Sequence, residues 1–102
     1  MLQVIIENRE IINQLCCKYK VRELYVFGSA LNDNFDQSNS DIDFLVDFGS
    51  MDGLTKAHIY FDMLEDFTKL FDTRVDLVMV GAVKNRYIAD DIEATKQILY
   101  AA

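Results

Sequence analysis

The sequence has no proline and no tryptophan, a single histidine and only two cysteines. Cys16 and Cys17 are neighbours in the chain, so their α-carbons lie about 3.8 Å apart, whereas disulfides usually need about 4.4 to 6.8 Å. One histidine, His58, and the lack of any CxxC spacing leave no ligand set for a zinc site. These shortages exclude a disulfide-stabilised secreted domain and a zinc site, and we expect both cysteines to be reduced.

Basic residues are also few, because 10 lysines and arginines face 17 aspartates and glutamates and give a formal net charge of -7. Such a chain repels a polyphosphate backbone, and no local basic patch offsets this repulsion. No basic segment precedes the apolar residues 1–6, so the sequence shows no secretory signal. We predict a cytoplasmic protein without direct contact to nucleic acid or membrane, whose acidity suits divalent cations, a basic protein partner or simply solubility.

The length of 102 residues predicts one domain that spans residues 1–102. Half of the residues are apolar and a quarter are charged, which is typical of a globular protein. Apolar spacing predicts helices at residues 3–20, 54–71 and 84–100, and strands at residues 21–27, 42–48 and 74–80. This order predicts an α/β (α+β) domain with a small mixed β-sheet flanked by helices, whose first two strands are antiparallel neighbours.

Gly28 and Ser29 follow directly after the first predicted strand. A glycine at this point lets backbone amides approach a phosphate, and the serine hydroxyl adds another hydrogen-bond donor. A glycine–serine pair on its own is more often a simple turn. The pair therefore gains weight only if other groups that handle phosphates lie nearby.

Two carboxylates, Asp41 and Asp43, stand two residues apart at the start of the second strand, so both point to one face of the sheet. Like charges held this close repel each other, and a bound cation would neutralise them. A solvated strand end is the alternative for an isolated Asp-x-Asp pattern.

A third carboxylate, Asp76, lies within the apolar third strand. Burying an unpaired carboxylate costs several kcal/mol, so we expect a partner for it. The partner is a metal ion, or else an ion pair with Arg74 or Arg22.

These groups together predict phosphoryl-transfer chemistry. Asp41, Asp43 and Asp76 are the predicted catalytic and metal-binding residues, and Gly28 and Ser29 are predicted to bind the nucleotide. Mg²⁺ prefers such hard oxygen ligands, and two ions about 3.5 to 4 Å apart would activate the attacking hydroxyl and stabilise the leaving pyrophosphate.

The combined pattern is Phe-Gly-Ser at residues 27–29, a polar loop, Ser-Asp-Ile-Asp-Phe-Leu-Val at residues 40–46 and Val-Asp-Leu-Val at residues 75–78. It resembles the DNA polymerase β-type nucleotidyltransferases, most closely the minimal nucleotidyltransferase group, over nearly the whole chain. The resemblance implies a nucleotidyltransferase fold, ATP bound at Gly28 and Ser29, and magnesium bound by the three aspartates. It departs from that family after Ser29, where residues 30–33 replace a usually basic stretch.

The resemblance also implies a partner protein. Members of this group are commonly antitoxins that transfer AMP from ATP to a tyrosine of a HEPN-type ribonuclease toxin, with which they can form a hetero-oligomer. Because the basic stretch is missing, an antitoxin that neutralises its partner by binding alone is the main alternative. A nucleotidyltransferase that acts on small molecules is another.

Other conspicuous residues receive weaker interpretations. We expect Tyr60, Phe61, Phe67 and Phe71 to lie in the core, although a surplus exposed row of aromatic residues could dock a partner. Residues 84–86 are the nearest basic cluster in sequence that could reach a nucleotide, but a loop before a helix is the better interpretation. We assign no role to His58.

Overall fold

The computed structural model describes residues 2–28 and 41–102. Ser29 and the predicted polar loop at residues 32–40 therefore lie outside the described residues. The elements follow one another along the chain as α1 (Leu2–Glu7), α2 (Arg9–Lys18), β1 (Glu23–Phe27), β2 (Ile42–Asp47), α3 (Gly53–Phe71), β3 (Val75–Met79), α4 (Arg86–Thr95) and β4 (Gln97–Ala101).

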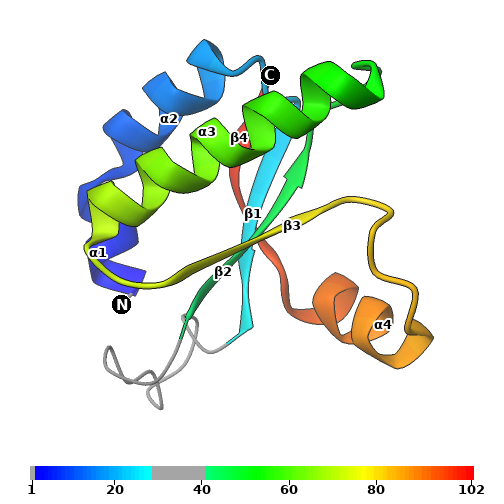
Figure 1. The fold of residues 1–102 in the computed structure, drawn as a ribbon. Helices are drawn as coiled ribbons and strands as arrows, with labels where there is room; N and C mark the ends of the chain where they lie inside the picture. The colour runs from blue at the N-terminus through cyan, green and yellow to red at the C-terminus, as the bar shows by residue number, and fades with distance from the viewer. Residues whose placement is uncertain (1, 29–40) are drawn as a thin grey trace.

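The four strands form one mixed sheet in the order β3-β2-β1-β4. β1 is antiparallel to both β2 and β4, and β2 is parallel to β3. The helices α1, α2 and α3 lie on one face of this sheet, and α4 lies on the other (Figure 1). The predicted mixed sheet flanked by helices is confirmed, as is the antiparallel pairing of the first two strands.

The core fills the space between the sheet and the helices α1, α2 and α3. Along β2, Ile42, Phe44 and Val46 are completely buried, because alternate residues of a strand point to the same face. Phe44 contacts the rings of Phe67 and Phe71 on α3, with centroids 5.0 and 5.7 Å away. The other face of β2 therefore carries Asp43, Leu45 and Asp47.

The single first helix predicted over residues 3–20 is divided into α1 and α2. The break lies at Asn8, whose side-chain amide donates a hydrogen bond to the carbonyl oxygen of Val4 at 2.8 Å. Asparagine competes in this way for local backbone groups, which favours turns over helix interiors. Ile5 and Ile12 are nevertheless both fully buried, so the apolar spacing identified the correct face.

The predicted helix over residues 84–100 is wrong at its carboxyl end, because α4 ends at Thr95 and residues 97–101 form β4. Lys96 takes extended backbone angles, with φ -60° and ψ 143°, and the chain then pairs with the otherwise open edge of β1. Leu99 is buried in the core from this strand. The stabilisation from strand pairing and burial outweighed the helix preference indicated by the apolar spacing. Such local spacing contains no information about a distant strand edge.

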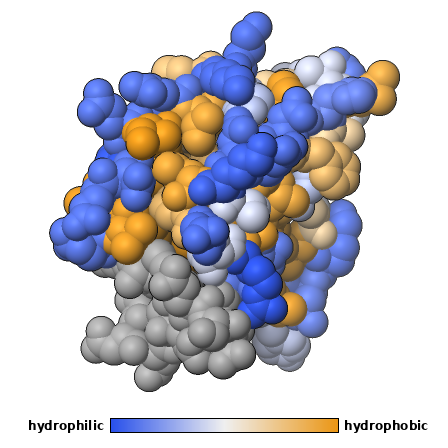
Figure 2. All heavy atoms as spheres, turned by 60° about the vertical axis from the view of Figure 1, so that its left-hand side comes forward, coloured by the Kyte–Doolittle hydropathy of each residue, from blue (hydrophilic) through white to orange (hydrophobic). Residues whose placement is uncertain are grey.

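Phe61 also differs from its predicted core position, since 65% of its surface is exposed on α3. The buried residues of α3 are Met63, Phe67 and Phe71, which share one face of the helix. Figure 2 shows hydrophobic surface interspersed among hydrophilic side chains. No helix within residues 2–28 and 41–102 is long and apolar enough to cross a membrane.

The aromatic contact between β2 and α3 generates a stability prediction. We expect Phe44→Ala to lower the free energy of unfolding by about 3 to 5 kcal/mol, because it removes a buried ring and leaves a cavity. Phe61→Ala is the matched control on exposed surface and should change it by less than about 0.5 kcal/mol. Urea unfolding followed by circular dichroism measures both, and equal effects would contradict the assignment of Phe44 to the core.

Candidate active site

The ends of three strands meet at one edge of the sheet. Asp43, at the start of β2, lies beside Phe27 at the end of β1 and beside Asp76 at the start of β3. Asp43 alternates with the buried residues of β2, and Asp76 precedes the buried Leu77 on β3. Both carboxylates therefore lie on the face of the sheet opposite α1, α2 and α3. The structure brings together two of the three predicted aspartates as direct neighbours.

Gly28 lies directly against Asp43. Its φ is +75°, and a Cβ atom built at this position would lie 2.5 Å from Oδ2 of Asp43. Any other residue would be strained by the left-handed backbone and would also collide with the carboxylate. Glycine is therefore required here by the site itself, and its backbone offers a close approach for a ligand beside Asp43. The role predicted for Ser29 stays a prediction, since that residue lies outside the described part of the chain.

The surroundings of Asp43 disfavour the ionised form of its carboxylate. Burial, followed by the negative charges of Asp76 and Asp41, raises its pKa from 3.8 to about 6. Each of these causes disfavours the ionised form, which loses water and gains like charges nearby. A cation at this position would relieve both penalties.

Asp76 is more exposed than we predicted. The sequence suggested a buried carboxylate in need of a partner, whereas the side chain lies in solvent. The difference arises because β3 is an edge strand and Asp76 lies at its beginning. Its position next to Asp43 therefore does not depend on a desolvated charge.

Arg74, one of the two arginines predicted as partners for Asp76, pairs with Asp41 instead. Nε of Arg74 lies 3.0 Å from Oδ1 of Asp41 in an ion pair. Within residues 2–28 and 41–102, no group of three histidine, cysteine, aspartate or glutamate side chains is arranged to hold a metal ion. Asp43 and Asp76 nevertheless supply adjacent carboxylate oxygens, the ligand type that Mg²⁺ takes. Metal binding by all three aspartates stays a prediction.

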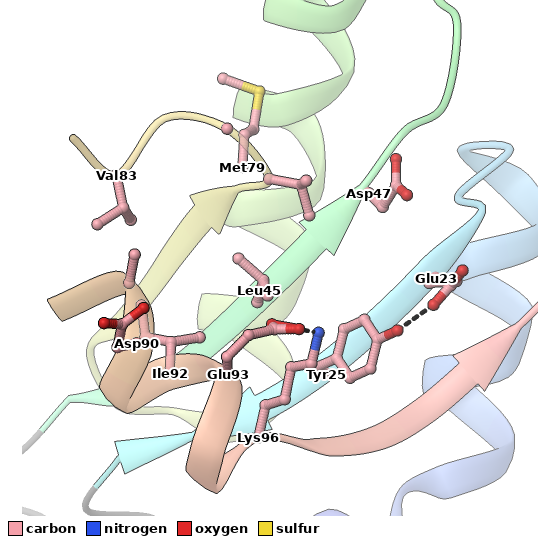
Figure 3. A pocket seen from close by; sticks show the side chains of 13 residues that line it. Glu23, Tyr25, Leu45, Asp47, Met79, Val83, Asp90, Ile92, Glu93 and Lys96 are labelled. Carbon is pink, nitrogen blue, oxygen red and sulfur yellow. Dashed lines mark hydrogen bonds and ion pairs between the residues drawn. The ribbon is translucent and has the colours of Figure 1, made fainter. Parts of the chain in front are cut away.

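A cavity of about 480 Å³ lies on this same face, between α4 and the sheet (Figure 3). Leu45 lines it from β2 and is two residues beyond Asp43, which corresponds to about 6.7 Å along a strand. Met79 and Val83 line it from β3 and the following loop, and Ile92 lines it from α4. No pattern in the sequence indicated this cavity, because its walls come from segments far apart in the chain and the end of α4 was predicted incorrectly.

Several polar groups along the cavity already bind one another. Nζ of Lys96 lies 2.7 Å from Oε2 of Glu93 and 4.2 Å from the centre of the Tyr25 ring. The Tyr25 hydroxyl donates a hydrogen bond to Glu23, which raises the pKa of Tyr25 to about 12. The rest of the lining combines the carboxylates of Asp47 and Asp90 with apolar side chains such as those of Leu45 and Ile92.

Comparison with known proteins places the chain in a family. A model of the nucleotidyltransferase domain matches residues 8–99. A protein of Methanocaldococcus jannaschii, provisionally named a protein adenylyltransferase, is 43% identical over 77 residues that cover 74% of each chain. The chain belongs to the nucleotidyltransferase domain family. The resemblance seen in the motifs of this nucleotidyltransferase is thus confirmed.

Two solved structures share the nucleotidyltransferase fold. One is a toxin–antitoxin complex with AMP-PNP, which is 21% identical and covers 93% of this chain and 74% of that chain, with a TM-score of 0.68. The other holds the tri-AMPylated HEPN toxin of Shewanella oneidensis with its MNT antitoxin. That match is 21% identical and covers 100% of this chain and 74% of that chain, with a TM-score of 0.63.

The stressed carboxylate generates a prediction about stability. We expect Asp43→Asn to stabilise the fold at pH 7 by on the order of 1 kcal/mol, after discounting the pKa shift for partial exposure. The folded protein binds the Asp43 proton more tightly than the unfolded chain. Wild-type stability should therefore rise as pH falls from about 6 towards the unfolded value of 3.8, and the advantage of asparagine should shrink.

Urea unfolding at pH 7 and at about pH 4.9, the midpoint of that window, measures this difference. Millimolar Mg²⁺ should raise the melting temperature of the wild type and leave Asp43→Asn nearly unchanged. An asparagine variant that is less stable than the wild type at pH 7 would contradict the electrostatic account.

Proposed function

We propose that this nucleotidyltransferase transfers AMP from ATP to a tyrosine hydroxyl of a HEPN-type toxin and thereby acts as its antitoxin. The observation that carries the proposal is the Asp43 and Asp76 pair beside the backbone of Gly28, in a chain of this family. The name of the Methanocaldococcus jannaschii relative supports transfer of AMP to a protein. The structural neighbours, an AMPylated HEPN toxin with its antitoxin and a complex with AMP-PNP, support the partner and the nucleotide.

In the proposed reaction the tyrosine oxygen attacks the α-phosphorus of ATP. An oxygen–phosphorus bond forms, the bond to the β-phosphate breaks, pyrophosphate leaves and the hydroxyl proton is released. Asp43 and Asp76, together with Asp41, would hold Mg²⁺, which neutralises phosphate charge and lowers the pKa of the attacking hydroxyl. The backbone at Gly28 would position the phosphates beside these carboxylates.

The cavity under α4 is the proposed place for the adenine base. It begins next to Leu45, so a nucleoside that extends along β2 from a phosphate at Asp43 would reach it. Its apolar side chains suit the faces of a purine ring, and pockets of this kind combine an apolar lining with a few polar groups. We further propose that residues 1–102 act as one domain and that the reaction takes place in the cytoplasm, where ATP is available.

The cavity generates a test of nucleotide binding. Ala89 lines the cavity from α4, and Ala89→Phe should place a ring inside it and weaken ATP binding by about tenfold or more. Ala94→Phe adds the same ring to an exposed position of α4 outside the cavity and should leave ATP binding unchanged. Isothermal titration calorimetry measures the affinities, and melting temperatures show whether both variants are folded. Equal ATP affinities of the two variants would show that the adenine base does not bind in this cavity.

The transfer itself is tested on the partner. Incubation with ATP, Mg²⁺ and a HEPN-type toxin should add AMP to a toxin tyrosine, as mass spectrometry of the intact protein and its peptides would show. Asp43→Asn should slow this transfer by at least about a hundredfold, because it removes charge from the site of phosphoryl transfer. Asp62→Asn, an exposed position on α3, is the matched control and should remain active.

The alternative of an antitoxin that acts by binding alone gives a different result. In that case toxin neutralisation would survive Asp43→Asn and no mass change would occur on the partner. Chelation of divalent cations with EDTA separates the two functions in the same way, since it should abolish transfer but leave binding intact.

A further inference from the structure

The pairing of β2 and β3 continues beyond the two neighbouring aspartates. Ile42 lies opposite Val75, and the amide of Ile42 donates a hydrogen bond to the carbonyl oxygen of Arg74 at 3.0 Å. Asp41 and Arg74, which directly precede Ile42 and Val75 in the chain, therefore lie side by side. Because Arg74 precedes Asp76 by two residues of extended chain, its side chain shares the face that carries the carboxylates.

The ion pair between these two residues is half open to solvent. Oδ1 of Asp41, which faces Nε of Arg74 at 3.0 Å, is shielded from water. The Arg74 side chain is 64% exposed and that of Asp41 is 45% exposed. A guanidinium group has five N–H donors in a planar fork, so one contact to Asp41 leaves donors that can engage a second anion.

The segment that follows Gly28 in the sequence supplies no positive charge. Residues 29–40 contain no lysine, arginine or histidine and include two aspartates. In the described part of the chain, the basic residues that begin the α4 region are engaged elsewhere, with Lys84 on the carbonyl oxygen of Gly81 and Arg86 near Asp90. Arg74 is the basic side chain that the fold places against a carboxylate of the site.

We propose that Arg74 binds the triphosphate of the nucleotide, and that Asp41 holds its guanidinium in place until the nucleotide arrives. This inference rests on the proposed function and assigns a residue that replaces the missing basic stretch after Ser29. Arginine matches the geometry of phosphate oxygens with two parallel hydrogen bonds. When Arg74 moves to the phosphates, its ion pair with Oδ1 of Asp41 breaks and this oxygen can approach a cation, so nucleotide and cation binding should favour each other.

Calorimetry on the purified chain tests this assignment with three variants. In the presence of Mg²⁺, Arg74→Gln should weaken ATP binding by about 10- to 100-fold, and Arg74→Lys should recover part of the loss. Arg22→Gln removes the same charge near the opposite end of β2 and should bind ATP as the wild type does. For Mg²⁺ alone, Arg74→Gln should bind more tightly than the wild type, because Asp41 no longer has to release the guanidinium.

The opposite directions of these two changes separate a phosphate-binding arginine from a structural one. If Arg74→Gln weakens binding of both ATP and Mg²⁺ and lowers the melting temperature, Arg74 only supports the fold and the inference is overturned. It is also overturned if the wild type binds ATP and Arg74→Gln binds it equally well, while the proposed function stands. A wild-type chain that binds no ATP in the presence of Mg²⁺ would overturn the proposed function and this inference together.

Discussion

The structure is organised around a concentration of negative charge at the start of β2. Asp43 lies between β1 and β3, with Asp76 as its neighbour and the Gly28 backbone against its carboxylate. Its raised pKa expresses the cost of this arrangement. Nearby features accommodate that cost: Gly28 has no side chain, Asp76 remains in solvent, and Asp41 forms an ion pair with Arg74.

The two faces of the sheet differ in character: one packs against the core, and the other carries the carboxylates. The face towards α1, α2 and α3 is apolar, with Phe44 packed on Phe67 and Phe71, and it supplies the hydrophobic burial that stabilises the fold. The opposite face can therefore carry carboxylates that repel one another. Strained or repulsive groups persist at functional sites only where the surrounding structure compensates for them. In this chain a single strand, β2, contributes to both faces through its alternating side chains.

The carboxyl-terminal segment completes the site from the other side. By pairing with β1, β4 closes one edge of the sheet and sets the point from which α4 folds back across the face that carries Asp43. The cavity between α4 and Leu45 exists because of that placement. The same face of the sheet thus carries the neighbouring carboxylates of Asp43 and Asp76 and a cavity lined in part by apolar side chains.

The sequence alone determined the elements with strong local signals, and the alternation along β2 and β3 indicated that Asp43 and Asp76 would lie together. The apolar alternation of β2 and the motif around Gly28, Asp41, Asp43 and Asp76 were sufficient to predict the mixed sheet and the family. Only the tertiary structure decided that Arg74 pairs with Asp41, that Asp76 is exposed and that residues 97–101 form a strand. Local periodicity reports which face of a segment is apolar, whereas ion pairs, edge strands and cavities depend on which distant segments become neighbours.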